Sequence, residues 1–170
     1  MGRFSGLAGI KTNAGGMYFK PGQYEIEIAE IKTSESSKDK RLSVIFEVVV
    51  IESDNLERPA GSKPSQVIKL GGPYPELPMG DLKHVVGTLM GLEDIDNYTA
   101  TAVDPAIPND TIEAATDREW SQMIEALVAP EQPAKGMRCK LYVFDKEREG
   151  KHSITKHVWG PLVVAEAAPA

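Results

Sequence analysis

The stretch Met137-Arg-Cys-Lys-Leu-Tyr-Val-Phe144 alternates without a break between two kinds of side chain. Because successive side chains of a β-strand point to opposite faces, this alternation predicts a strand with an apolar face and a second, chemically different face. The apolar face comprises Met137, Cys139, Leu141 and Val143, and the second face comprises Arg138, Lys140, Tyr142 and Phe144. Cations interleaved with aromatics can follow a phosphate backbone and stack on unpaired bases. The same face could instead be a second packed layer beneath helices, and the pattern leaves both interpretations open.

The sequence predicts four further strands around this one. Gln23 to Lys32 alternates until Ile31 breaks the phase, which predicts a bulge near Ala29-Glu30. Arg41 to Glu52 is rich in β-branched residues, so we expect a central strand buried on both faces. Short strands are expected at Ser65–Leu70 and, after a charged turn, at His152–Trp159.

The middle of the chain changes to a helical period. Leu77 to Leu92 has apolar residues spaced along one helix face, with Asp81 as the expected N-cap and Gly91 as the expected C-cap. Thr116-Asp-Arg-Glu119 has the form of a capping box, which predicts a second helix ending at Val128 with Trp120 on its apolar face.

Five strands interrupted by helices after the third predict a mainly β fold, a five-stranded Greek-key barrel of the oligonucleotide-binding (OB) type. One or two helices would lie between strands 3 and 4. The predicted organisation is a Gly-rich arm at 1–22, an OB-like domain at 23–162 with an acidic helical insertion at about 77–130, and a short tail at 163–170.

The charge of the chain is unevenly distributed. The formal net charge is −6, but residues 1–41 carry +2, residues 42–134 carry −11 and residues 135–160 carry +4. Because charges interact mainly within about 8–10 Å in salt, the basic ends could bind a polyanion despite the overall sign. An ordinary solvated hairpin would give the same +4, so charge alone leaves the choice open.

Several classes of protein are disfavoured. No apolar run approaches the roughly 18 residues that span a bilayer, and the N-terminus lacks the apolar segment of a signal peptide, so we expect a cytoplasmic protein without a membrane partner. The single cysteine, Cys139, excludes an internal disulfide and is expected to be a packing residue. His84 is expected at the surface, and His152 and His157 on opposite faces of one strand. With no nucleophile–base pair or ligand cluster at workable spacing, we expect no catalysis, no metal and no cofactor.

Other stretches resemble a known family. The matching segments are Pro21-Gly-Gln-Tyr-Glu-Ile, Lys38-Asp-Lys-Arg-Leu-Ser-Val-Ile-Phe-Glu-Val, Arg58-Pro-Ala-Gly-Ser, Pro133-Ala-Lys-Gly-Met and the closing Ile154-x-x-His-x-Trp. Over roughly residues 17–162 the chain resembles the OB-fold single-stranded-DNA-binding proteins of bacteriophages. The resemblance implies a role in replication or recombination within the host cytoplasm. It places strand binding on basic and aromatic residues, and the candidate set is Lys38, Lys40, Arg41, Arg138, Lys140, Tyr142, Phe144, Lys156 and Trp159.

Two functional hypotheses follow. The first is a sequence-tolerant single-strand binder, with replication or recombination proteins as further partners. Many relatives in the resembled family end in an acidic tail that recruits such partners, whereas this chain ends with only Glu166 as an acid in its last ten residues. The second is a phage structural or interaction protein, such as a capsid-decorating or tail component, that uses the β domain for subunit contacts. Oligomeric state and preference for DNA or RNA stay open.

Overall fold

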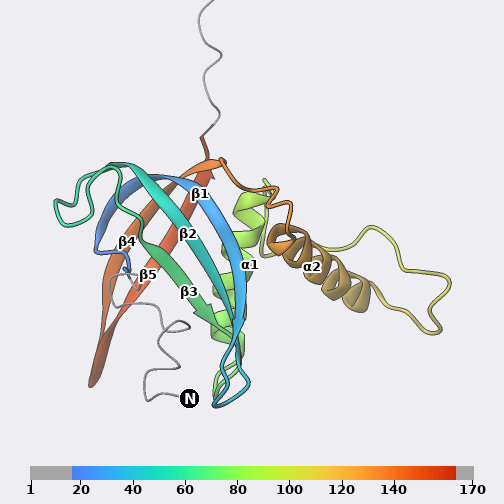
Figure 1. Ribbon diagram of the computed structural model, residues 1–170. Helices are drawn as coiled ribbons and strands as arrows, with labels where there is room; N and C mark the ends of the chain where they lie inside the picture. The colour runs from blue at the N-terminus through green and yellow to red at the C-terminus, as the bar shows by residue number, and fades with distance from the viewer. Residues whose placement is uncertain (1–16, 164–170) are drawn as a thin grey trace, which may run out of the picture.

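The strands form one antiparallel five-stranded sheet in the order β3-β2-β1-β4-β5, in a computed structural model that describes residues 17–163 (Figure 1). Two helices lie between the third and fourth strands, as the change of period predicts. The elements are β1 (Gly22–Glu35), β2 (Leu42–Ser53), β3 (Ser65–Lys69), α1 (Glu76–Leu89), α2 (Ile112–Val128), β4 (Arg138–Arg148) and β5 (Lys151–Leu162). The predictions for the arm before Met17 and for the tail after Val163 lie outside the described residues.

β1 is the centre of the sheet and changes its partners at the predicted bulge. Its register against β2 shifts between Ile28 and Glu30, which confirms the bulge. Pairing with β4 ends on the same stretch, where the Ile28 N–H donates to the carbonyl of Met137 at 2.8 Å. Beyond it, the Gln132 side chain accepts from the Ile31 N–H at 2.8 Å and donates to its carbonyl at 2.7 Å. A side-chain amide therefore continues the hydrogen bonding of β1 where β4 departs.

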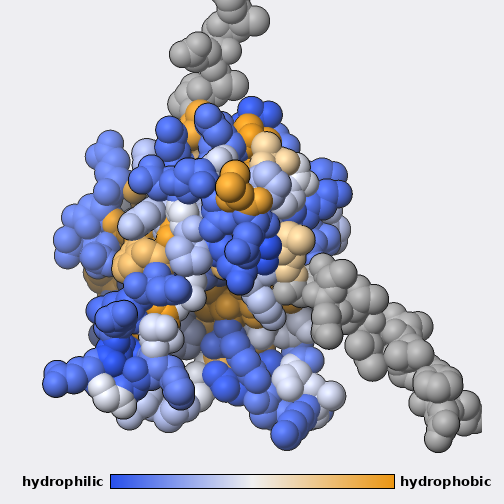
Figure 2. Space-filling model, turned by 90° about the vertical axis from the view of Figure 1, so that its left-hand side faces the viewer, coloured by the Kyte–Doolittle hydropathy of each residue, from blue (hydrophilic) through white to orange (hydrophobic). Residues whose placement is uncertain are grey.

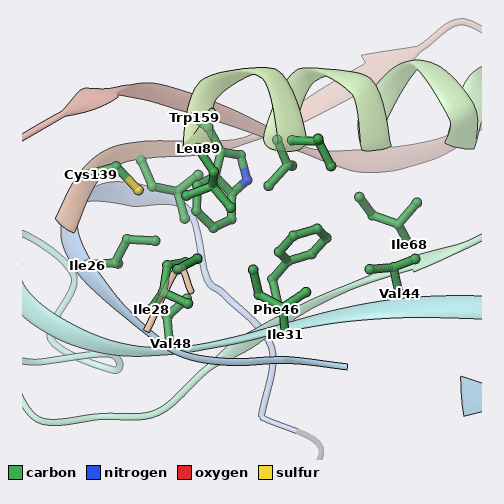
Figure 3. Packing of buried hydrophobic residues seen from close by; sticks show 14 of the residues in the cluster. Ile26, Ile28, Ile31, Val44, Phe46, Val48, Ile68, Leu89, Cys139 and Trp159 are labelled. Atoms are coloured by element: carbon green, nitrogen blue, oxygen red, sulfur yellow. The ribbon is translucent and has the colours of Figure 1, made fainter. Parts of the chain in front are cut away.

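The core lies between the inner face of the sheet and α1. Figure 3 shows Trp159 and Leu89 on one side of this core and Ile28, Val48 and Phe46 on the other. All five side chains are buried, with Phe46 fully enclosed. Burying such side chains stabilises the fold by about 1.5–3 kcal/mol each, so this layer holds α1 against the sheet.

β3 and β5 are the two edges of the sheet, and strand pairing does not close it into the predicted barrel. The gap between these edges is bridged in other ways. The indole N–H of Trp159 on β5 donates to the side-chain oxygen of Gln66 on β3 at 2.6 Å. α1 contacts both edge strands, and Phe19 is buried against the rings of Tyr24 and His157. One end of the gap is thus filled by side chains.

The expectation that β2 is buried on both faces is wrong. Its inner residues Val44, Phe46, Val48 and Val50 are buried, whereas the residues between them are only partly buried. The reason is that α1 packs on the inner face and leaves the outer face of β2 without an equivalent layer.

The helix ends also differ from the prediction. α1 begins at Glu76, so Asp81 lies inside the helix and is not its N-cap. Gly91, with φ of 72°, follows the C-cap Met90, in the left-handed position where glycine is favoured. The N-cap of α2 is Thr111, whose hydroxyl accepts from the Ala114 N–H at 3.1 Å. Thr116 lies one turn inside α2, so the predicted capping box is wrong. Trp120 is buried, as predicted.

The segment between α1 and α2 projects away from the sheet, opposite the β4–β5 hairpin (Figure 1). Bonds to α2 organise it. The Arg118 guanidinium donates to both oxygens of Asp110 at 2.8 and 2.6 Å, and the Tyr98 hydroxyl donates to Glu119 at 2.5 Å. Neither described helix is long and apolar enough to cross a membrane.

Candidate nucleic-acid interface

The second face of β4 points away from the core. Cys139, Leu141 and Val143 are almost fully buried on the inner face, so the alternation places Tyr142 and Phe144 outside. Tyr142 is 47% exposed and Phe144 is partly buried. Their rings stack with centroids 5.2 Å apart and an interplanar angle of 24°. A packed layer beneath a helix would not leave Tyr142 this exposed, so the structure favours the surface interpretation of these two residues.

The cations of the same face have acidic neighbours on β1. Arg138 lies opposite Glu27, and its Nε is 3.3 Å from the Glu27 carboxylate. Lys140 lies opposite Glu25. These carboxylates reduce the positive potential at the β1 side of the face, so Arg138 and Lys140 are weaker phosphate-binding candidates than their spacing in the sequence suggests.

The β5 side of the face has a different character. Val158 is opposite Tyr142, and Lys156 is opposite Phe144. Lys156 is therefore the cross-strand neighbour of Phe144, whereas Lys140 has the carboxylate-bearing Glu25 as its neighbour on β1. The outer face thus divides into a neutralised half along β1 and a cationic, aromatic half along β5.

Trp159 was predicted to bind the strand, but the structure places it in the core. It is only 3% exposed, and its indole ring lies 5.9 Å from that of Phe46 in the core. Its side-chain N–H is bonded to Gln66, and its backbone N–H donates to Nε2 of His84 at 2.9 Å. A base cannot stack on a ring held in this way, so Trp159 belongs to the scaffold.

His84 is also placed differently from the prediction. It is partly buried and links α1 to β5 through its bond with Trp159, whereas the sequence suggested a surface residue. Burial lowers the pKa of His84, with the nearby Asp81 and Asp96 opposing that shift. The neutral imidazole is the form whose Nε2 can accept the Trp159 N–H.

The β1–β2 loop presents two exposed lysines. Lys38 and Lys40 lie in a turn closed by bonds between Ser36 and the backbone of Lys40 and Arg41, at 2.8 and 2.9 Å. Arg41 has a structural role, since its guanidinium donates to the carbonyls of Leu70 and Gly71 at 2.8 and 3.1 Å. Arg41 thereby ties the β1–β2 loop to the segment that follows β3.

A groove lies at the open end of the gap between the sheet edges, and we term it the β3–β5 groove. Its volume is about 460 Å³. Its walls are formed by Gln66–Lys69 of β3 and Ile154–His157 of β5, and its rim includes Tyr74 and Leu77. Figure 2 shows the side of the molecule that carries the β4–β5 hairpin, with a hollow in its lower half and hydrophobic residues at the base of that hollow. Four cations from four segments line the groove, namely Arg41, Lys69, Arg148 and Lys156.

The groove combines positive charge with apolar and aromatic surface. Tyr74 is 65% exposed and Leu77 is similarly exposed, so both can contact a bound molecule. Lys69 pairs with Asp39 at 3.0 Å, and this hydrogen bond lowers the pKa of Asp39 to about 2. Asp81 is the carboxylate that lines the groove. Cations therefore outnumber acids on its walls, which favours an anionic ligand.

The sequence prediction missed Lys69, Tyr74 and Arg148. They lie on β3, in the segment before α1 and at the end of β4, with no shared motif. They come together only because the sheet order places β3 and β5 on the two sides of the gap. Lys156 is the one member of the candidate set besides Arg41 that the structure places in the groove.

The titratable groups of the described residues bear on metal binding and on the charge of the binding surface. They contain no group of three or more His, Cys, Asp or Glu side chains placed to hold a metal ion. Burial raises the pKa of the Cys139 thiol to about 12 and lowers the pKa of His157 to about 4. At neutral pH both groups are uncharged, so His157 adds no positive charge to the groove that it lines.

Comparison with known proteins finds no family model that matches the chain and no match among curated proteins.

Proposed function

We propose that this protein binds single-stranded DNA with little sequence preference and acts in bacteriophage DNA replication or recombination in the host cytoplasm. The observation that supports it best is the β3–β5 groove, in which four cations surround apolar surface and the exposed ring of Tyr74. Cations along a groove track phosphates, and aromatic faces accept any base, because every base has a π-face.

The architecture supports an OB-type assignment as part of this proposal. OB folds are partly open five-stranded Greek-key barrels that bind oligonucleotides on the face of strands 2 and 3, between the loops that join strands 1–2 and strands 4–5. Here the β3–β5 groove has β3 as one wall, Arg41 from the end of the β1–β2 loop on one border and Arg148 beside the β4–β5 turn on another. The open edge between β3 and β5 would then be the open side of the barrel.

A single strand suits this surface better than a duplex. Stacking on an exposed aromatic residue contributes about 1–3 kcal/mol per base and requires the base face to be accessible. In a duplex the base faces are covered by their neighbours, which leaves phosphate contacts alone. The expected preference is therefore for unpaired DNA, with binding that weakens as salt is raised.

The test is a titration of the purified protein against fluorescently labelled oligo-dT and against duplex DNA of equal length, at two salt concentrations. We expect tighter binding to oligo-dT at both concentrations and a Tyr74→Ala variant that binds oligo-dT more weakly, with Leu56→Ala, a fully exposed loop residue, as the matched control. Equal or tighter binding to duplex would contradict the proposal. Failure to bind either nucleic acid would favour the structural-protein hypothesis.

A further inference from the structure

We propose that a bound single strand does not end in the β3–β5 groove but crosses the edge of β5 and continues on the outer face, over Phe144 and Tyr142. This inference rests on the proposed function and adds to it a path for the strand. It joins two surfaces that lie on opposite sides of one edge strand: the groove, and the aromatic half of the outer face.

Lys156 belongs to both surfaces. It lines the groove, and it is the cross-strand partner of Phe144. Directly opposed residues of neighbouring strands point to the same face of a sheet with their Cβ atoms about 4.5–5.5 Å apart. The ammonium group of Lys156 can therefore bind a phosphate at the point where the strand passes from the groove to the aromatic pair.

The geometry of β5 permits this crossing. β5 is the last strand of the sheet, so within the described residues no further strand separates its groove side from its outer face. Ile154 repeats the arrangement of Lys156, since it also lines the groove and pairs with Lys146 on β4. Two consecutive outward positions of β5 thus form a continuous border between the surfaces.

The aromatic pair provides the next contacts. The rings of Tyr142 and Phe144 stack on each other, so a base beside the pair can stack on a ring face that points away from the other ring. Beyond Tyr142 the surface becomes negatively charged. Lys140 lines a depression that also contains Glu25, Glu52 and Asp54. These carboxylates repel phosphate, so the path ends near Tyr142 and does not extend to Arg138.

The length of the ligand tests this path. Single OB-type domains occupy about 4–16 nucleotides, so an oligo-dT at the lower limit should fill the groove alone, whereas one at the upper limit should also reach the outer face. We expect Tyr142→Ala to weaken binding of the long oligomer by roughly tenfold and to leave the short one nearly unchanged, since it removes one stacked base. Tyr142→Phe, which keeps the ring, should bind both like the parent. Tyr74→Ala should weaken both.

The outcomes separate this inference from the function on which it rests. If the parent protein binds neither oligomer, the proposed function fails and the path with it. If both oligomers bind but Tyr142→Ala weakens them equally, or weakens neither, single-strand binding stands and the crossing is wrong. A Lys156→Ala variant adds an independent measurement: it should weaken both oligomers because Lys156 lines the groove, and weaken the long one more because it also binds the crossing phosphate. Equal weakening of the two by Lys156→Ala would count against the crossing.

Discussion

The β3–β5 groove and the segment between the two helices carry opposite charges and are built in different ways. The groove gathers Arg41, Lys69, Arg148 and Lys156 from separate strands and loops. Residues 90–111, between the helices, contain five acids and no Lys or Arg, and the first two turns of α2 add three acids and one cation, Arg118. Local bonds shape that acidic segment, above all the paired bonds from Arg118 that hold the pKa of Asp110 well below its usual range. In Figure 1 the segment between the helices projects away from the sheet, opposite the β4–β5 hairpin, whose strands contribute Arg148 and Lys156 to the groove.

This comparison shows why the net charge of −6 is a poor guide to the ligand. Screening in salt limits the influence of an exposed charge to about 8–10 Å, so each region acts on a ligand through its own charges. The acidic segment can lower the net charge of the protein without neutralising the groove. A polyanion would be drawn to one side of the molecule and repelled from the other.

The largest expected effect distinguishes a buried residue of β5 from an exposed residue of β4. Trp159→Ala should lower the free energy of unfolding by about 3–5 kcal/mol, because it leaves a core cavity and an unpaired Gln66. Tyr142→Ala, on the exposed neighbouring position, should change it by less than about 1 kcal/mol. Urea denaturation followed by circular dichroism measures both. A Trp159→Ala protein as stable as the parent would return Trp159 to the candidate binding set.

The next effect concerns pH. Burial holds the pKa of His157 at about 4 in the folded protein, below its usual 6.5, so the unfolded chain binds the proton more tightly. The stability that this group contributes is therefore complete above pH 6.5 and is lost as pH falls toward 4. With one pKa unit equivalent to about 1.4 kcal/mol, the lowering from 6.5 to about 4 corresponds to an expected loss of roughly 3 kcal/mol by pH 4.

Urea denaturation at a series of pH values tests this dependence. His84, whose pKa is also lowered, should add to the decline in the same window. Asp39 titrates near pH 2, outside that window. A His157→Gln variant should show a shallower decline between pH 6.5 and 4. If the variant lost stability with pH as steeply as the parent, protonation of His157 would not destabilise the folded protein.

These expectations show which parts of the molecule the sequence could predict. The strands, the bulge at Ile28 and the inner faces follow from side-chain alternation, which is a local property. The groove depends on β3 and β5 becoming the two edges of one sheet, and no local pattern near Lys69 or Arg148 contains that information. Trp159 was ambiguous because it lies near the end of its strand, where only the contact with α1 decides between core and surface.

A smaller effect compares two lysines on the outer face. Lys156→Ala should lower the salt slope of oligo-dT binding by roughly 0.7, the value for one phosphate contact on a single strand. Lys140→Ala should lower it by less, because Glu25 lies opposite Lys140 and competes with a phosphate. Binding measured over a series of salt concentrations gives both slopes. Equal salt slopes for the two variants would show that Glu25 does not reduce phosphate binding by Lys140.

The smallest effect belongs to the acidic segment. Glu93→Gln removes one exposed negative charge from the acidic segment. Because the segment projects away from the sheet, a strand in the groove should lie beyond the screening length of about 8–10 Å, and binding to oligo-dT should change by less than about twofold. Lowering the salt lengthens the screening distance, so any gain in affinity should appear first at low salt. A large gain at ordinary salt would show that the acidic segment competes with the strand for the groove, and the separation of the two regions would then be wrong.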